Sequence, residues 1–310
     1  MWFKNLRLYR LTGPFTLSAQ ALDQQLASRA FAPCARTATF SYGWESPFGS
    51  TNPLQVHAVN GCLLICARRD EKIMPAGVLR HMVRNKVAAL EQSQQRKVHK
   101  REREAIRDEV IQDVLPRALL RSSLTHAYLW PSQGWLIIDT ASTKAAEALI
   151  GLLRATLGSF VVEPLSVQHT PAAVMTQWLM QRAMPAGLVA EDECVLQDPF
   201  QDGGTVRCRG LDLAGAEVRA HLEAGKLVTR LALCWNESLS LVLEQDLAIK
   251  RLHFADLLRS RSEDIGHEDA AAQLDADFAI MTLELSRVLT ALVQMFGGVA
   301  SASQPAVQAA

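Results

Sequence analysis

The segment from residue 76 to about residue 115 constrains the fold more than any other part of the chain. It has one glycine, near its start, and no proline before Pro116. Apolar side chains recur at helical spacing toward both of its ends, whereas residues 91–104 are almost wholly polar. We therefore predict two helices, at about 77–95 and 101–115, folded back on each other as a projecting hairpin. A single long helix is the alternative.

Outside this segment, two kinds of short run alternate irregularly along the chain. Strand patterns occur at 2–12, 56–68, 124–140, 160–167, 205–211, 227–235, 238–244 and 247–254, with hairpin turns at Asn60-Gly61 and near Pro131–Gly134. Helical periodicity occurs at 16–30 with Ser18 as N-cap, and at 143–157, 171–182, 214–223 and 268–296, whereas glycines and prolines predict a loop at 40–54. This order favours an α+β fold with mixed, mainly antiparallel sheets over a doubly wound parallel sheet.

The composition is that of a globular protein, with 49% hydrophobic and 21% charged side chains. Charges at Lys4, Arg7 and Arg10 interrupt the N-terminal stretch, which therefore does not resemble a signal peptide. No later stretch approaches the roughly 20 uncharged apolar residues that a membrane span needs. We expect a soluble, cytoplasmic protein with no membrane partner, and we interpret its six scattered cysteines as buried, reduced thiols.

The formal net charge is zero, but the charges are unevenly distributed. From Arg68 to Arg121 there are 14 basic and 8 acidic residues, a surplus of +6. From Glu263 to Glu284 there are seven acidic residues and no Lys or Arg. Any argument for an anionic partner must therefore rest on the basic middle of the chain.

Two interpretations of the basic stretch at 96–107 remain open. It can be a solvated helix face on which charges interact four residues apart. Alternatively, its basic side chains bind phosphates, which would make binding sensitive to salt. No aromatic residue lies between Phe48 and Tyr128. Because single strands are bound by stacking on aromatic rings, this favours contacts with the backbone of duplex DNA.

Sequence signals for catalysis and for cofactors are weak. There is no P-loop and no nucleophile elbow, and the eight histidines lie singly. A metal-dependent nuclease could in principle use four carboxylates near the C-terminus, namely Glu268, Asp269, Asp275 and Asp277. However, an apolar stripe through Leu274, Phe278, Met281 and Leu285 predicts a helix with these carboxylates on its solvent side. We therefore expect no catalytic residue, no metal ligand and no cofactor.

Several short segments stand out together, in a particular order and spacing. They are Met1-Trp-Phe-Lys-Asn-Leu6, Ile65-Cys-Ala-Arg68 with Glu71-Lys-Ile73, Asp108-Glu-Val110 with Leu115-Pro-Arg-Ala118, Asp202-Gly-Gly204 with Arg207, His221-Leu-Glu-Ala-Gly-Lys226, and Asp275-Ala-Asp-Phe278 with Met281-Thr282. Together they resemble the RdgC family of recombination-associated proteins, from residue 1 to about residue 298. Two departures are visible: Leu119 and Leu120 stand where members often carry Phe, and Cys208-Arg209-Gly210 where consecutive lysines occur.

The resemblance implies a ring-shaped homodimer whose basic central hole encloses double-stranded DNA without sequence preference. It implies a nucleoid-associated role in recombination and replication, including restraint of the RecA recombinase, and no catalysis. The expected domains are a central α+β domain at 1–74 and 118–170, a helical tip at 75–117, a C-terminal α+β domain at 171–298, and a disordered tail at 299–310. An alternative is a protein-interaction module that acts directly on a recombination enzyme.

Two sets of site residues follow from these arguments. The expected DNA contacts are Arg68, Arg69, Arg96, Lys97, Lys100, Arg101, Arg103, Arg117, Arg121, Arg207, Arg209 and Lys226. The resemblance implies contacts between subunits at the helical hairpin and in the C-terminal part, for which the expected residues are Leu115, Leu119, Leu120 and Phe278.

Overall fold

The N-terminal half of the chain forms a seven-stranded antiparallel sheet. The computed structural model describes residues 1–49, 52–200, 203–265 and 270–300. The strands are β1 (Arg7–Leu11), β2 (Phe40–Glu45), β3 (Val56–Val59), β4 (Cys62–Ile73), β5 (Leu119–Trp130), β6 (Trp135–Ile138) and β7 (Val162–Pro164). Their order is β2-β4-β5-β6-β1-β7, and β3 pairs with β4 as well. Helices α1 (Ala19–Ala27) and α4 (Thr143–Leu157) pack on one face of this sheet.

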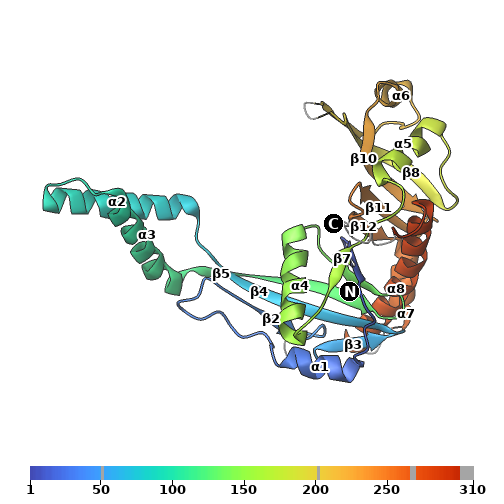
Figure 1. Ribbon diagram of the computed structural model, residues 1–310. Coiled ribbons are helices and arrows are strands. Elements are labelled where there is room, and N and C mark those ends of the chain that lie inside the picture. The colour runs from blue at the N-terminus through green and yellow to red at the C-terminus, as the bar shows by residue number, and fades with distance from the viewer. Residues whose placement is uncertain (50–51, 201–202, 266–269, 301–310) are drawn as a thin grey trace, which may run out of the picture.

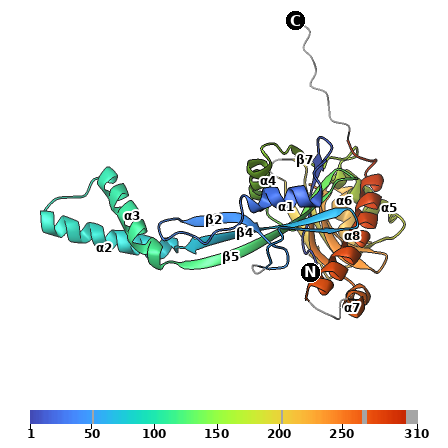
Figure 2. The same cartoon turned by 90° about the horizontal axis from the view of Figure 1, so that it is seen from below.

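Strands β4 and β5 carry the chain away from the body of the molecule as a long arm (Figures 1 and 2). They pair continuously from Leu63–Leu129 to Ile73–Leu119. At the end of the arm lie α2 (Ala76–Gln94), α3 (Lys100–Val114) and the 3₁₀ turn η1 (Leu115–Arg117). The predicted helical hairpin is thus confirmed. It has its own small apolar core, made of Val87, Val98, Ile106 and Val110.

The C-terminal half forms a second antiparallel sheet, covered by helices on one face. Its strands are β8 (Leu188–Gln197), β9 (Thr205–Arg209), β10 (Leu227–Trp235), β11 (Leu239–Glu244) and β12 (Ile249–Phe254), in the order β12-β11-β10-β8-β9. The helices of this half are α5 (Pro171–Gln181), α6 (Ala216–Glu223), α7 (Asp256–Ile265) and α8 (Ala270–Met295). Leucines that alternate along β10 and β11 pack against α5, α6 and α8. The residues between them, which include Arg230, Ser240 and Glu244, lie on the opposite, open face.

One continuous core joins the two halves. The backbone of Leu6 pairs with that of Ile249 in β12. On α8, Phe278 packs edge-on against Tyr128 of β5, with ring centroids 5.7 Å apart. Figure 1 shows the result, a crescent with the arm on one side and the second sheet on the other. The expected α+β class with mainly antiparallel sheets is therefore confirmed.

The first strand is shorter than the sequence pattern indicates, and the reason is tertiary. Only Arg7–Leu11 of the expected 2–12 strand pairs in the sheet. The residues before it run toward α8 and β12: the Phe3 N–H donates to the sulfur of Met281, and the Lys4 carbonyl accepts from Leu252. The predicted helix at 16–30 is likewise confined to Ala19–Ala27, with Ser18 confirmed as its N-cap.

Two strands lie where the sequence pattern indicated none. β2 occupies part of the expected loop at 40–54. Gly43, which contributed to the loop prediction, is required there by packing, because a Cβ atom would lie 2.7 Å from the Cα of Phe31. The other unexpected strand is β8, whose apolar pattern is interrupted by three acidic residues at 191–193.

Helix α8 corrects one further expectation. By length and composition it could span a membrane, with a mean hydropathy of 1.4, contrary to the prediction that no such stretch exists. However, Phe278, Met281, Leu285, Val288 and Leu289 on α8 are at most 1% exposed and belong to the protein core. Residues 299 and 300, at the start of the expected tail, bond to residues 167 and 166. Residues 301–310 lie outside the described part of the chain.

The cysteines are free thiols in the structure. Cys62, Cys66, Cys194 and Cys208 are buried, whereas Cys34 and Cys234 are partly exposed. Burial raises the pKa of the Cys62 and Cys66 thiols to about 12, which keeps them protonated.

Candidate nucleic-acid interface

Helices α2 and α3 form a basic groove at the end of the arm. The groove has a volume of about 1080 Å³, and Leu79, Val83 and Val87 of α2 supply much of its apolar lining. Exposed basic side chains line it from both helices, namely Arg80, Arg84, Lys100, Arg103 and Arg107. Glu104 is the acidic residue of the lining. Positive charge therefore surrounds an apolar floor.

The basic residues expected at the tip differ in how freely they can bind an anion. Arg96 donates to both carboxylate oxygens of Glu102, from Nη1 at 2.7 Å and from Nη2 at 2.6 Å. This pairing raises the pKa of Arg96 and lowers the pKa of Glu102. In contrast, four exposed residues have no ion-pair partner among the described residues: Lys97, Lys100, Arg101 and Arg103. These four are the better phosphate donors, and Arg96 instead connects the loop between the helices to α3.

Along the strands of the arm, most of the expected arginines are already paired. Arg68 donates from Nε to Asp70 at 2.9 Å, and its guanidinium lies over the Phe31 ring. Arg69 lies over the Phe40 ring. Arg121 donates to Glu71 at 3.1 Å.

A neighbouring expected contact, Arg117, is different. It is exposed and has no ion-pair partner in the described part of the chain. The strands of the arm therefore offer less uncompensated charge than the helical hairpin.

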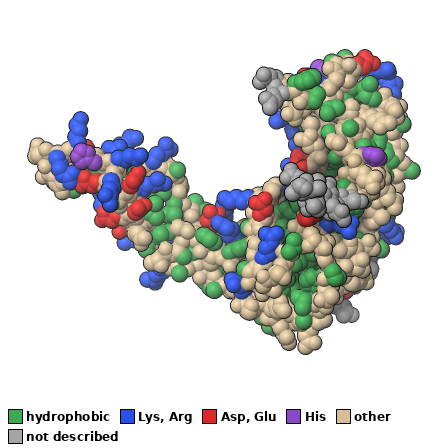
Figure 3. Space-filling view, viewed as in Figure 1, with side chains coloured by type: hydrophobic (Ala, Val, Ile, Leu, Met, Phe, Trp, Pro, Cys, Tyr) green, Lys and Arg blue, Asp and Glu red, His purple; other side chains and the backbone are tan. Residues whose placement is uncertain are grey.

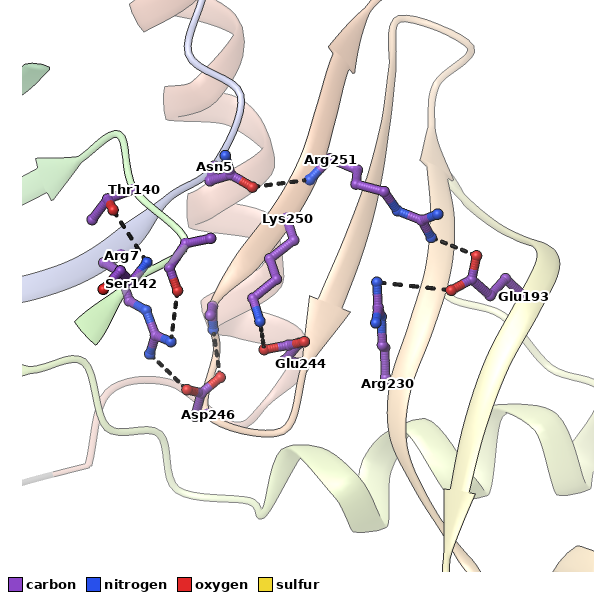
Figure 4. Close-up of polar contacts among 12 residues, drawn as sticks. Asn5, Arg7, Thr140, Ser142, Glu193, Arg230, Glu244, Asp246, Lys250 and Arg251 are labelled. Atoms are coloured by element: carbon purple, nitrogen blue, oxygen red, sulfur yellow. Dashed lines mark hydrogen bonds and ion pairs between the residues drawn. The ribbon is translucent and has the colours of Figure 1, made fainter. Parts of the chain in front are cut away.

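The open face of the second sheet carries another group of arginines. Arg209, Arg230 and Arg251 all approach the carboxylate of Glu193, and Figure 4 shows the last two of these contacts. Burial raises the pKa of Glu193, but the hydrogen bond from Arg251 and the three positive charges outweigh this effect and hold the pKa below its ordinary value.

The other two residues expected on this side behave differently from each other. Lys226 is paired with Asp198, with Nζ 3.8 Å from the carboxylate, and its side chain is only 17% exposed. Arg207 has no ion-pair partner among the residues that the structure describes. Arg207 is therefore the freer donor.

Sequence reasoning missed five arginines at these two sites. Arg80, Arg84 and Arg107 line the groove at the tip. Arg80 and Arg84 are four residues apart, and so are Arg103 and Arg107. This spacing was a signal in the sequence, because residues four apart share a helix face. Arg230 and Arg251 lie on different strands, and no local pattern places them beside Glu193.

Figure 3 shows how these charges are distributed on one face of the molecule. Lys and Arg side chains gather over the α2–α3 end of the arm, occur at the centre of the crescent, and reappear on the edge of the second lobe that faces the arm. Acidic side chains are interspersed among them. The concave side of the crescent is thus bordered by basic groups at both of its ends.

Comparison with known proteins identifies the family. The RdgC family model, described as "Putative exonuclease, RdgC", matches residues 1–299. The chain is 43% identical over 298 residues to the recombination-associated protein RdgC of Tolumonas auensis, covering 96% of this chain and 99% of that protein. It is 45% identical over 300 residues to the protein of the same name from Pseudomonas aeruginosa, covering 96% and 98%. The chain belongs to the RdgC family.

Within this RdgC family member, the four residues expected to join subunits fall into two classes. Leu119 and Leu120 are exposed, by 76% and 49%, at the junction of the arm and the hairpin. Leu115 is 3% exposed and Phe278 is fully buried, so their side chains offer almost no surface to another subunit. Both were expected at a subunit contact because of the family resemblance, which does not show which neighbouring element covers a side chain.

The carboxylates considered for a nuclease are not arranged as the sequence indicated. Asp277 was expected on the solvent side of its helix, but it is 5% exposed and accepts hydrogen bonds from the Met1 amine, Ser262 and Gln273. Asp275 is exposed and pairs with His57 at 3.2 Å.

The other two carboxylates of that set, Glu268 and Asp269, lie outside the described residues. Among the residues that are described in this RdgC chain, no three His, Cys, Asp or Glu side chains are grouped closely enough to hold a metal ion.

Proposed function

We propose that this RdgC family member is a non-enzymatic protein that binds double-stranded DNA without sequence preference, as a ring-shaped homodimer. In this proposal it acts in the cytoplasm on the nucleoid, during recombination and replication, and restrains the RecA recombinase by occupying DNA. Membership of a recombination-associated family supports the biological setting. The charge distribution of the chain supports the ligand.

The observation that carries the proposal is the presence of uncompensated basic side chains at both ends of the crescent. At the tip, Lys97, Lys100, Arg101 and Arg103 are exposed and have no ion-pair partner among the described residues. On the second sheet, Arg207 is in the same state. Guanidinium and ammonium groups of this kind bind backbone phosphates and carry no sequence information. A duplex lying along the concave side could contact both sets.

The homodimer is supported by apolar surface at the junction of the arm and the hairpin. Leu119, Leu120 and Leu124 of β5 are exposed by 76%, 49% and 53%. Ile73, which pairs with Leu119, is 44% exposed. Leu119 and Ile73 lie on one face of the arm, Leu120 and Leu124 lie on the other, and exposed apolar side chains gathered in this way are typical of interfaces. In a two-fold dimer the same patch on each subunit would be buried, and the basic surfaces would be doubled around one opening.

The test compares binding to linear and to sealed circular duplexes across a salt series. Phosphate contacts predict that log Kd changes linearly with log salt, with a slope of about 0.9 for each phosphate contacted. A closed ring predicts in addition that, once loaded, the protein stays longer on sealed circles, because it cannot slide off an end. A flat salt dependence, or a strong preference for one sequence, would contradict phosphate-backbone binding. Equal lifetimes on both substrates would contradict the ring.

A second candidate function is a module that contacts a recombination enzyme directly. The groove between α2 and α3 favours it, because its apolar floor and basic rim suit an acidic, partly apolar segment of another protein. Inhibition of RecA that persists at a salt concentration where DNA binding is lost would support this candidate. Inhibition that disappears together with DNA binding would support occupation of DNA instead.

The non-enzymatic part of the proposal has its own test. Linear duplex and single-stranded DNA are incubated with the protein and with Mg²⁺ or Mn²⁺, and shortened products are sought on a gel. We expect intact substrates. Cleavage that disappears on changing Asp275→Asn would instead establish a nuclease.

A further inference from the structure

On the open face of the second sheet, three guanidinium groups surround one carboxylate. Arg251 donates to Glu193 Oε2 from Nη2 at 2.6 Å. The Nε atom of Arg209 lies 3.6 Å from the same oxygen, and Nη2 of Arg230 lies 3.7 Å from Oε1. Only the first of these contacts is short. The group as a whole carries two positive charges in excess.

The fold brings these four residues together from four strands. Arg209 of β9 lies opposite Glu193 of β8 in the sheet register, and Arg230 of β10 lies opposite the next residue but one, Val195. Arg251 is placed by an irregularity in β12, where the register with β11 shifts and its own φ is 50°. A left-handed backbone at an arginine is unusual, and such positions are often associated with function.

The arginines keep donors available for a further acceptor. The side chain of Glu193 is only 12% exposed, whereas those of Arg209 and Arg251 are 72% and 51% exposed. The Nε–H of Arg230 is buried and has no hydrogen-bond partner among the described residues. Glu193, Arg209 and Arg230 line a depression of about 390 Å³, together with the unpaired Arg207.

Neighbouring carboxylates on this side of the sheet are balanced differently. Glu244 pairs with Lys250 at 2.7 Å, and Asp246 pairs with Arg7 at 2.6 Å, as Figure 4 shows. Each of these carboxylates therefore has one cation. The surplus of positive charge on this face is concentrated around Glu193, where three cations share one anion.

A backbone phosphodiester is the anion that this arrangement suits. It carries one negative charge on two oxygens, and guanidinium groups bind such oxygens with charge-assisted, often bidentate hydrogen bonds. A carboxylate presents the same charge and two oxygens to the same donors. Glu193 therefore competes with a phosphate for these arginine donors, and its own negative charge repels an approaching phosphate.

We propose that Glu193 is a built-in competitor that limits how tightly Arg209, Arg230 and Arg251 bind a phosphate of the DNA backbone. This inference rests on the proposed duplex binding, and it adds a new contact site and a residue that sets its strength. In the absence of DNA, Glu193 holds the three arginines together. When DNA binds, the arginines divide their donors between the carboxylate and the phosphate.

The test is duplex binding by Glu193→Gln, with Glu244→Gln as the matched control. Both changes remove one negative charge from the same face and keep the shape of the side chain. We expect Glu193→Gln to lower Kd by about tenfold at moderate salt, and to steepen the salt dependence by about one unit of slope, as for one more phosphate contacted. Glu244→Gln releases one lysine instead of three arginines, and we expect a change of less than about twofold.

Two further variants test whether Glu193 affects binding through the three arginines. Arg251→Gln in the Glu193→Gln background should remove most of the gain in affinity, because it removes the arginine with the shortest contact. Glu193→Asp keeps the charge but withdraws it by one methylene, and it should tighten binding by a smaller factor. It also serves as the test if Glu193→Gln does not fold, which the thermal unfolding curve will show.

The possible failures are distinguishable. Unchanged or weaker binding by folded Glu193→Gln, or an equal gain in Glu244→Gln, overturns the role of Glu193 while the wild-type salt dependence leaves the proposed function intact. If the wild-type protein shows no salt-dependent duplex binding, the proposed function and this inference are both wrong.

Discussion

Arg96 donates to both carboxylate oxygens of Glu102, and this pair connects the loop between α2 and α3 to the first turn of α3. Because its donors are occupied, Arg96 should contribute less to DNA binding than the unpaired Arg103 in the groove beside it. We expect Arg103→Gln to weaken duplex binding and to reduce the salt slope by about one. Arg96→Gln should leave the slope nearly unchanged. Fluorescence anisotropy with a labelled duplex measures both.

The two variants are matched, since each removes one arginine charge from the tip. Equal losses of affinity would show that only the total charge of the tip matters. In that case the Arg96–Glu102 pair opens when DNA binds.

The leucines around η1 predict separate effects on folding and association. Leu115 is 3% exposed, so Leu115→Ala should lower the free energy of unfolding by about 2–5 kcal/mol. Leu119 is 76% exposed, so Leu119→Ser should change the free energy of unfolding by no more than about 0.5 kcal/mol. If the proposed dimer uses this patch, Leu119→Ser should shift the protein toward monomer in analytical ultracentrifugation. An unchanged dimer would exclude Leu119 from the interface.

How far the sequence predicts this structure depends on whether a signal is local. The helical hairpin, the Asn60-Gly61 turn and the Ser18 cap follow from spacing and turn chemistry within a few residues, and all three are found. Phe278 was expected at a subunit contact, but it is buried against Tyr128 of β5, which is distant in sequence. Glu193 and Arg251 come together only through the order of strands in the sheet. A list of basic residues in the sequence therefore does not show which of them gather around Glu193.

Gly43 of β2 predicts an effect on stability that its sequence context would not suggest. An added Cβ would lie 2.7 Å from Cα and 2.9 Å from N of Phe31, both backbone atoms that cannot move freely. We expect Gly43→Ala to destabilise the fold by more than about 2 kcal/mol. Gly151, inside α4, has no atom within 4 Å of an added Cβ, and Gly151→Ala should stabilise by up to about 1 kcal/mol. Urea unfolding of the two variants should give changes of opposite sign.

The two aspartates of α8 should differ in the same assay. Asp277 is buried and accepts from the Met1 amine, Ser262 and Gln273. Asp277→Ala leaves these donors without an acceptor, and we expect a loss of about 3 kcal/mol. Asp275 is 58% exposed, and Asp275→Ala should cost less than about 1 kcal/mol. Similar losses for the two variants would contradict the buried role of Asp277.

His126 of β5 predicts how stability depends on pH. Burial, with a smaller effect from the nearby N-terminal positive charge, lowers the pKa of His126 to about 4. Its pKa in the unfolded chain is about 6.5. A lowered folded-state pKa means that the stabilisation is fully present above pH 6.5 and is lost as the pH falls toward 4. Glutamine cannot be protonated, so we expect His126→Gln to remove on the order of 2 kcal/mol of this loss. This is less than the free energy that corresponds to the full pKa difference, because the side chain is partly exposed. The measurement is the free energy of unfolding at pH 7 and pH 4.5 for both proteins, and parallel curves would show that His126 is not responsible.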